Sequence, residues 1–263
     1  MAEVERVRQL LAATSVPAEV AASWLDEAPA LWLTGEASAE LLASDLALCH
    51  PTLGAGEVRA RALPIDYSGG WRLTVVAPDR PGLMADTAGV LAEERLSVSS
   101  ASALTWTGTG IALHSITMAA AELEPERWQD IGRRIRAAAG IGGPDVAFEP
   151  SGAAHVSATG ADEEVGGSPR SLLTVTAPDQ IGLLWAICRT LADQRVSIEV
   201  AQVGGEGGTA RDLFVTTGAV DVADLAARLS VTGRSRLARA ASGIAGSVPL
   251  VGPVLRRGVE AVM

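Results

Sequence analysis

The chain repeats itself at an offset of 100 residues. Leu73–Asp79, LTVVAPD, corresponds to Leu173–Asp179, LTVTAPD, and in each copy a Gly-Leu pair follows three residues after the aspartate. About a third of positions 72–118 agree with 172–218 without a gap. Agreement of this extent indicates two copies of one supersecondary unit, and this restricts the fold more than any other feature of the sequence.

Both copies predict the same order of elements. A short run rich in β-branched residues predicts a strand, Pro-Asp-x-x-Gly predicts a turn, and apolar residues at helical spacing predict a helix. Two further strands follow, joined by a glycine-rich hairpin turn. In the first copy, a helix over 124–139 and a strand over Asp145–Glu149 complete the unit. The order is βαββαβ, the ferredoxin-like arrangement, and the predicted fold class is α+β.

The second copy is harder to complete from its sequence. Val220–Leu229 predicts its second helix, and Ser247–Val251 is a candidate for its last strand. The predicted organisation is a helical N-terminal segment over 1–66, a first unit over 70–150, a linker rich in Gly, Ala, Ser and acidic residues over 151–169, a second unit over 170–230 and a basic tail rich in alanine and glycine over 231–263.

Composition excludes several functions. The formal net charge is −10, and every basic residue is arginine, because the chain has no lysine and also no asparagine. Schiff-base and P-loop lysine chemistry are therefore impossible. The acidic balance argues against nucleic-acid binding. The charged start of the chain lacks an apolar signal core, and no apolar run reaches the roughly 18–20 residues of a membrane span, so we expect a cytoplasmic protein.

No catalytic or metal centre is predicted. Three histidines and two cysteines show no metal-ligand spacing, and neither a Gly-x-Ser-x-Gly nor a strand-linked Gly-x-Gly-x-x-Gly motif is present. We expect no catalytic residues, no metal and no cofactor. Cys188 lies at a core-facing helix position, and packing is its expected role.

The paired segments Ala77–Leu83, APDRPGL, and Ala177–Leu183, APDQIGL, resemble the ACT domain family. Two such domains in tandem after a helical stretch are similar to the C-terminal half of bacterial PII-protein uridylyltransferases. The resemblance implies a regulatory protein that binds a small ligand, usually an amino acid. In the uridylyltransferases the resemblance points to glutamine as that ligand. The nucleotidyltransferase and phosphohydrolase motifs of those enzymes are absent, since the chain has no Asp-x-Asp and no His-Asp.

The turn after the first strand has a chemistry that suits an amino acid. The unpaired N–H groups at the start of the following helix can receive a carboxylate without any lysine. An aspartate in the turn can accept hydrogen bonds from an ammonium group, or it can cap the helix. The family also places ligand contacts at the start of the next strand, where this chain has serine instead of asparagine. The candidate ligand-binding residues are Asp79, Arg80, Pro81, Gly82, Leu83, Ser97 and Val98 in the first copy, and Asp179, Gln180, Ile181, Gly182, Leu183, Ser197 and Ile198 in the second.

The two turns differ, because Arg80-Pro81 in the first corresponds to Gln180-Ile181 in the second. The sequence predicts unequal affinities, with the first site closer to the family pattern. Three hypotheses remain: an amino-acid sensor, an ACT-based dimerisation scaffold without ligand, and a degenerate relative of the uridylyltransferases. A homodimer or a protein partner is expected. The two units could pair their sheets within one chain, or an unfinished second copy could leave an edge open to a partner chain.

Overall fold

The computed structural model describes residues 2–33, 37–65, 70–106, 108–118, 125–165 and 168–231. Both repeats form the expected strand–helix–strand–strand–helix core. In the first these elements are β2 (Gly70–Pro78), α5 (Leu83–Glu93), β3 (Val98–Trp106), β4 (Ile111–Met118) and α6 (Pro125–Ile141). In the second they are β6 (Ser168–Pro178), α7 (Leu183–Asp193), β7 (Ser197–Val203), β9 (Thr209–Thr217) and α8 (Val222–Leu229), with a short β8 (Gly205–Glu206) in the hairpin turn.

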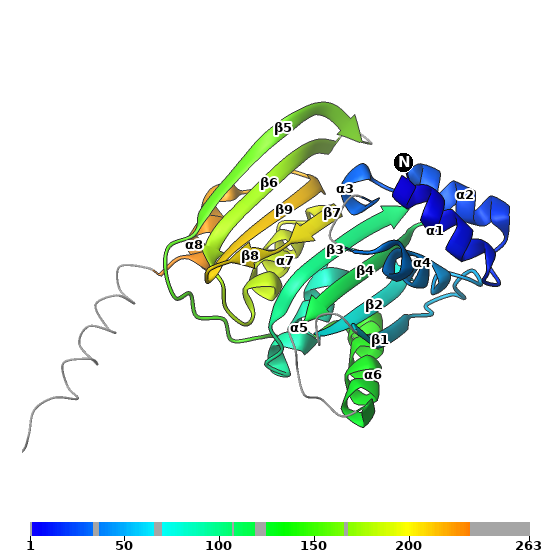
Figure 1. Cartoon of the computed structure of the whole chain (residues 1–263). Helices are drawn as coiled ribbons and strands as arrows, with labels where there is room; N and C mark the ends of the chain where they lie inside the picture. The colour runs from blue at the N-terminus through cyan, green and yellow to red at the C-terminus, as the bar shows by residue number, and fades with distance from the viewer. Residues whose placement is uncertain are drawn as a thin grey trace, which may run out of the picture. The chain divides into compact units, whose positions relative to one another are not determined.

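One antiparallel sheet runs through both repeats, in the order β1-β2-β4-β3-β7-β9-β6-β5, with β8 paired to β9 (Figure 1). Its outer strands are β1 (Arg59–Ile65) and β5 (His155–Val165). The repeats join through β3 and β7, whose register pairs Ala101 with Val203 and Leu104 with Val200. The side-by-side pairing of the two units therefore occurs within one chain.

The closing strand of the first unit is not the one that the sequence predicted. Asp145–Glu149 lies in a loop, and the strand beside β2 is β1, which precedes the repeat and belongs to the predicted helical N-terminal segment. Pro64 suits this outer position, where one side of the strand needs no ladder donors. Val146 and Phe148 instead pack against the main hydrophobic core. The unit is thus a ferredoxin-like sheet whose fourth strand comes from before its first strand.

The second unit is completed in the same way. The predicted linker 151–169 contains β5, which pairs antiparallel with β6 from His155↔Thr176 onward. Its Gly, Ala, Ser and acidic composition predicted a linker, but a backbone ladder requires N–H and C=O groups and not apolar side chains. Both outer strands therefore precede their repeats. The candidate strand Ser247–Val251 lies outside the described residues.

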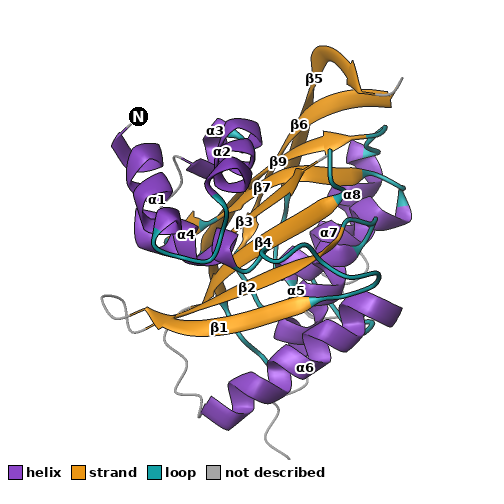
Figure 2. Cartoon of the chain, turned by 90° about the vertical axis from the view of Figure 1, so that its right-hand side faces the viewer, coloured by secondary structure: helices purple, strands orange, loops and turns teal. Residues whose placement is uncertain are grey.

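Helices cover the sheet from two sides (Figure 2). On one face lie the repeat helices α5, α6, α7 and α8. Apolar residues at helical spacing on these helices join inward-facing strand residues in one core that spans both repeats, with Leu91, Ile131, Leu191 and Phe214 among its fully buried members. The close approach of α5 and α7 depends on Gly89, where a Cβ would lie 3.0 Å from Cδ1 of Trp185.

The other face carries the N-terminal helices α1 (Ala2–Ala12), α2 (Ala18–Glu27), α3 (Ala30–Leu33) and α4 (Ala39–Ala47). They form a second core against the first repeat, which includes Trp24 and Trp106, with ring centroids 6.0 Å apart. The Nε1–H of Trp106 donates to the Trp24 carbonyl at 3.3 Å, which assigns this tryptophan to packing.

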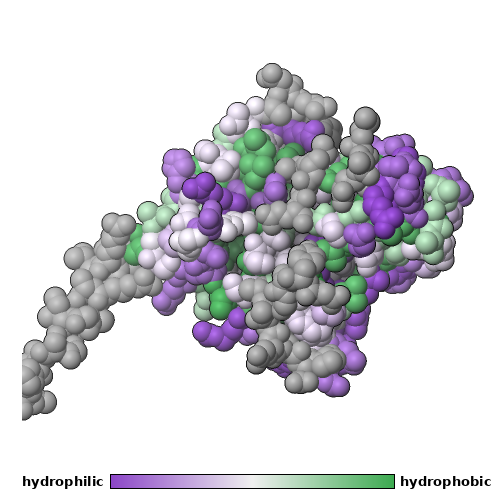
Figure 3. All heavy atoms as spheres, in the orientation of Figure 1, coloured by the Kyte–Doolittle hydropathy of each residue, from purple (hydrophilic) through white to green (hydrophobic). Residues whose placement is uncertain are grey.

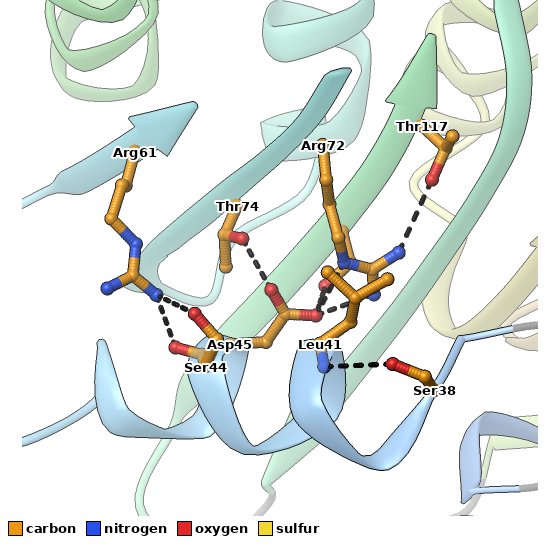
Figure 4. Close-up of polar contacts among 9 residues, drawn as sticks. Ser38, Leu41, Ser44, Asp45, Arg61, Arg72, Thr74 and Thr117 are labelled. Atoms are coloured by element: carbon orange, nitrogen blue, oxygen red, sulfur yellow. Dashed lines mark hydrogen bonds and ion pairs between the residues drawn. The ribbon is translucent and has the colours of Figure 1, made fainter. Parts of the chain in front are cut away.

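A buried polar cluster fastens α4 to the sheet (Figure 4). The Asp45 carboxylate is 1% exposed and accepts hydrogen bonds from Nε of Arg72 at 2.9 Å, Oγ1 of Thr74 at 2.5 Å and Oγ of Ser115 at 2.7 Å. Because every donor comes from β2 or β4, this one side chain sets where the N-terminal helices sit on the sheet.

The N-terminal helices lie over the first repeat and the junction, where α3 contacts β3 and β7. On the same face of β6, Leu172 is 42% exposed. Hydrophobic and hydrophilic residues are mixed on the side of the molecule seen in Figure 3.

Candidate ligand site at the junction of the two repeats

The two Pro-Asp-x-x-Gly turns have the same backbone geometry. The N–H of Asp79 donates to the Gly110 carbonyl at 2.8 Å, and that of Asp179 donates to the Gly208 carbonyl at 2.9 Å. The N-cap positions of α5 and α7 are Gly82 and Gly182, with φ of 84° and 88° and no side-chain cap. Glycine is thus needed at these positions for its left-handed backbone, and neither aspartate caps its helix.

Each turn faces the other repeat. A cavity of about 260 Å³ is lined by the second turn together with Ser97 and Val98 of the first repeat. A cavity of about 20 Å³ is lined by the first turn together with Ser197 and Ile198 of the second. All fourteen candidate residues line one of these two cavities. The crosswise pairing results from the β3–β7 junction, which places the start of each strand beside the helix of the neighbouring repeat.

The two cavities differ in size and in the contribution of the hairpin turns. Gly204 and Gly205 line the larger cavity and have no side chains to fill it. At the corresponding positions of the first repeat, Leu104 and Thr105 continue strand β3 and do not line the smaller cavity. The sequence predicted that the first turn would form the stronger site, whereas the second turn borders the larger of the two cavities.

The Arg80 guanidinium forms its hydrogen bonds with other parts of the chain. Its Nε donates to the Ala139 carbonyl at 3.1 Å, and its Nη2 contacts both the Ala138 carbonyl, at 3.2 Å, and the Asp86 carboxylate. The guanidinium therefore satisfies the last carbonyls of α6. In the second turn, Nε2 of Gln180 donates to the Glu149 carbonyl at 2.9 Å. Both side chains thus hold neighbouring segments in place.

The sequence-based reasoning missed Asp212, which lines the larger cavity from β9 and is 1% exposed. Its Oδ1 accepts a hydrogen bond from the Gly204 N–H at 3.4 Å. Burial, together with the nearby charge of Asp179, raises the pKa of Asp212 to about 7, against the lowering effect of the Gly204 N–H. The sequence did contain a signal, because Asp212 replaces Ala112 of the first copy on the strand face that also carries the buried Ala210 and Phe214.

Trp185 and Leu184 supply an apolar wall to the same cavity. At the start of α7, the N–H groups of Leu183 and Ala186 already donate to the carbonyls of Gln180 and Gly182. Those of Leu184 and Trp185 have no acceptor within the helix and lie at its positive dipole end, where an anion can bind. The larger cavity therefore brings together a place for a carboxylate, two acidic side chains for an ammonium group, and an apolar wall.

Thiol chemistry and metal binding have little support in the described residues. Cys188 lines the smaller cavity and is 2% exposed, and burial raises its thiol pKa. Among the described residues, no group of three or more histidine, cysteine, aspartate or glutamate side chains is placed to hold a metal ion. None of the described helices combines the length and the apolar character that crossing a membrane requires.

Residues 171–233 match the family described as ACT domain. The chain contains an ACT domain. This ACT domain corresponds to the second repeat, and the first repeat shares its core of elements and its Pro-Asp-x-x-Gly turn. The chain is also 30% identical over 177 residues to the bifunctional uridylyltransferase/uridylyl-removing enzyme of Ralstonia nicotianae. That alignment covers 61% of this chain and 20% of the enzyme.

Solved structures give a weaker likeness. An aspartate kinase from Synechocystis shares 14% identity, with 61% of this chain and 26% of that chain covered and a TM-score of 0.37. The ligand-free regulatory subunit of aspartate kinase from Thermus thermophilus shares 11% identity, with 65% and 94% covered and a TM-score of 0.24. At these TM-scores the likeness carries no functional argument.

Proposed function

We propose that this chain is a regulatory protein that senses an amino acid at the junction of its two repeats. One observation carries the proposal: the larger cavity is built from the turn of one repeat and the strand start of the other. A ligand there touches both halves of the molecule. It can therefore shift an equilibrium between two packings of the repeats, provided that it binds one packing more tightly.

The ligand class follows from the groups around the cavity. The α-carboxylate would bind the N–H groups at the start of α7. The α-ammonium group would bind Asp179 and Asp212, which both line the cavity. Ser97 and the amide oxygen of Gln180, whose nitrogen already donates to the Glu149 carbonyl, would hydrogen-bond a polar side chain. An amide side chain fits these partners, and together with the resemblance to the uridylyltransferases this makes glutamine the first amino acid to test.

The proposal also includes a partner that responds to ligand binding. The chain spans about a fifth of the Ralstonia enzyme, so a catalytic role has no support from that similarity. We propose that the chain acts without catalysis in the cytoplasm, and that a partner protein or a second copy of the chain responds to the bound state. Regulation of nitrogen metabolism is the corresponding physiological role.

A thermal-shift screen of the common amino acids tests the proposal, because a ligand selective for the folded state raises Tm. Calorimetric titration of the positive amino acid would then compare two matched variants, Asp179→Asn and Asp79→Asn. We expect Asp179→Asn to weaken binding about tenfold or more, as for the loss of a charge-assisted hydrogen bond. We expect little change from Asp79→Asn.

If Asp79→Asn weakened binding more than Asp179→Asn, the amino acid would bind at the first turn and the proposed site would be wrong. If no amino acid at millimolar concentration raises Tm, the sensing proposal fails and the scaffold hypothesis is favoured. Sedimentation of the chain would then show whether it assembles with itself.

A further inference from the structure

A third cavity lies on the face of the sheet opposite the repeat helices. It has a volume of about 380 Å³ and is bordered by Trp32 and Leu41 of the N-terminal helices and by the open faces of β2, β3, β4, β7 and β9. The ACT-type turns do not reach it. Its size is within the range of small-molecule sites, which begins at about 300 Å³.

The floor of this cavity crosses the junction of the repeats. Ser102 on β3 and Gln202 on β7 are direct partners in the β3–β7 register, and both line the cavity. Their neighbours Ala101 and Ala103 are buried on the other face, so Ser102 and Gln202 present their side chains to this one. A molecule bound here would touch the N-terminal helices and both repeats at once.

The lining is rich in hydrogen-bond donors. Trp32 is 2% exposed, and its Nε1–H has no hydrogen-bond partner within the part of the chain that the structure describes. A buried donor without an acceptor is costly, and an indole N–H can only donate. A ligand that brings an acceptor oxygen would satisfy it.

The charge of the lining is positive. It includes Arg72 and Arg211 and no aspartate or glutamate. Arg72 is held in place and neutralised by Asp45 (Figure 4), and its Nη1 donates to Oγ1 of Thr117 at 3.3 Å. Arg211 is exposed and forms no ion pair with any described residue, so its charge is available to a ligand.

We propose that this cavity is a second ligand site, specific for a small molecule that bears a carboxylate. Arg211 supplies the charge, the Trp32 indole supplies a buried donor, and Ser102 with Gln202 supplies adaptable polar contacts across the junction. The proposal does not depend on amino-acid binding at the second turn. The two cavities share Ser99, Val203 and Gly204 among their lining residues.

Titration calorimetry of the full chain with succinate tests this proposal, with succinamide as the uncharged compound of the same size. We expect succinate to bind, succinamide to bind at least about tenfold more weakly, and Arg211→Gln to weaken succinate binding by a similar factor. Arg189→Gln is the matched control, because Arg189 is an exposed arginine on α7 that pairs with Asp193. Ser102→Leu would place a larger side chain in the cavity and should also abolish binding.

Circular dichroism melting curves would show whether each variant remains folded. Absence of succinate binding, equal binding of succinamide, or equal losses in Arg211→Gln and Arg189→Gln would overturn the proposal. Asp179→Asn separates the two sites, since it should weaken amino-acid binding and leave succinate binding unchanged. An equal loss of succinate binding in Asp179→Asn would place succinate in the junction cavity and would also overturn the proposal.

Discussion

Asp45 on α4 and Arg72 on β2 form a buried ion pair, with Oδ2 of Asp45 2.5 Å from Nη2 of Arg72. The two residues are 1% and 6% exposed. Asp45→Ala would leave Arg72 buried without its counter-ion, and we expect the free energy of unfolding to fall by about 3–5 kcal/mol. Urea denaturation measures this change. The same experiment on Asp130→Ala, which breaks exposed pairs on α6, should show a loss of about 0.5 kcal/mol. Equal losses would contradict a buried role for Asp45.

Asp212 should make stability depend on pH. Burial raises its pKa in the folded chain from 3.8 to about 7. Between these pH values the folded chain binds a proton that the unfolded chain releases, so stability falls as pH rises from about 4 to about 7. Asp212→Asn removes this cost, and the variant should be more stable than the parent at pH 8 by on the order of 4 kcal/mol. At pH 3 the two proteins should be equally stable.

Thermal melts of both proteins across this pH range provide the measurement. The same substitution should weaken amino-acid binding at pH 8, because it removes an anionic partner of the ammonium group. A stability difference that is independent of pH would show that Asp212 has its ordinary pKa in the fold.

Gly89 controls the contact between α5 and α7. A Cβ at this position would lie 3.0 Å from Cδ1 of Trp185 and 3.2 Å from the Pro144 carbonyl oxygen. Gly89→Val should therefore destabilise the fold by about 1–3 kcal/mol through overpacking, and it should also disturb the Trp185 wall of the junction cavity. Guanidinium denaturation and amino-acid titration would detect the two effects.

A control for this variant is Gly132→Ala on α6, where a Cβ would be no closer than 3.5 Å to Nη1 of Arg136. Alanine stabilises a helix interior relative to glycine, so this variant should gain about 0.5–1 kcal/mol. A loss at both positions would show that the helix packing is more crowded than the structure indicates.

Both thiols should be unreactive in the folded chain. Burial raises the pKa of Cys49 to about 12, and it raises the pKa of Cys188 as well. Because the thiolate is the reactive form, iodoacetamide at pH 8 should label neither residue in buffer and both residues in urea. Mass spectrometry of the alkylated chain reads the result directly. Rapid labelling of either residue in buffer would contradict its buried position.

The candidate site shows what local sequence can predict. Positive φ at Gly82 and Gly182 and the apolar spacing of the helices after them are local properties, so the turn and its helix could be placed in both copies. Asp212 could not be assigned to the site. It is separated from Asp179 by a helix, a strand and a hairpin turn, and only the pairing of β6 with β9 brings them to one cavity.

The outer strands show the opposite case. Residues 155–165 have the composition of a linker, and the segment that contains β1 was assigned to the helical N-terminal segment. Each becomes a strand because the edge beside it offers a row of unpaired N–H and C=O groups. These unpaired groups belong to the neighbouring strand. The segment that pairs with them therefore needs no periodic pattern of side chains of its own.

By itself, the sequence determined the repeat and the strand–turn–helix order of both copies, because these depend on short-range backbone and packing preferences. The tertiary structure decided which turn faces which strand, which of the two cavities stays open, and that a third cavity exists beneath the N-terminal helices. The physical reason is the β3–β7 junction: its register joins residues about 100 positions apart, such as Ser102 and Gln202, and no local preference specifies that pairing.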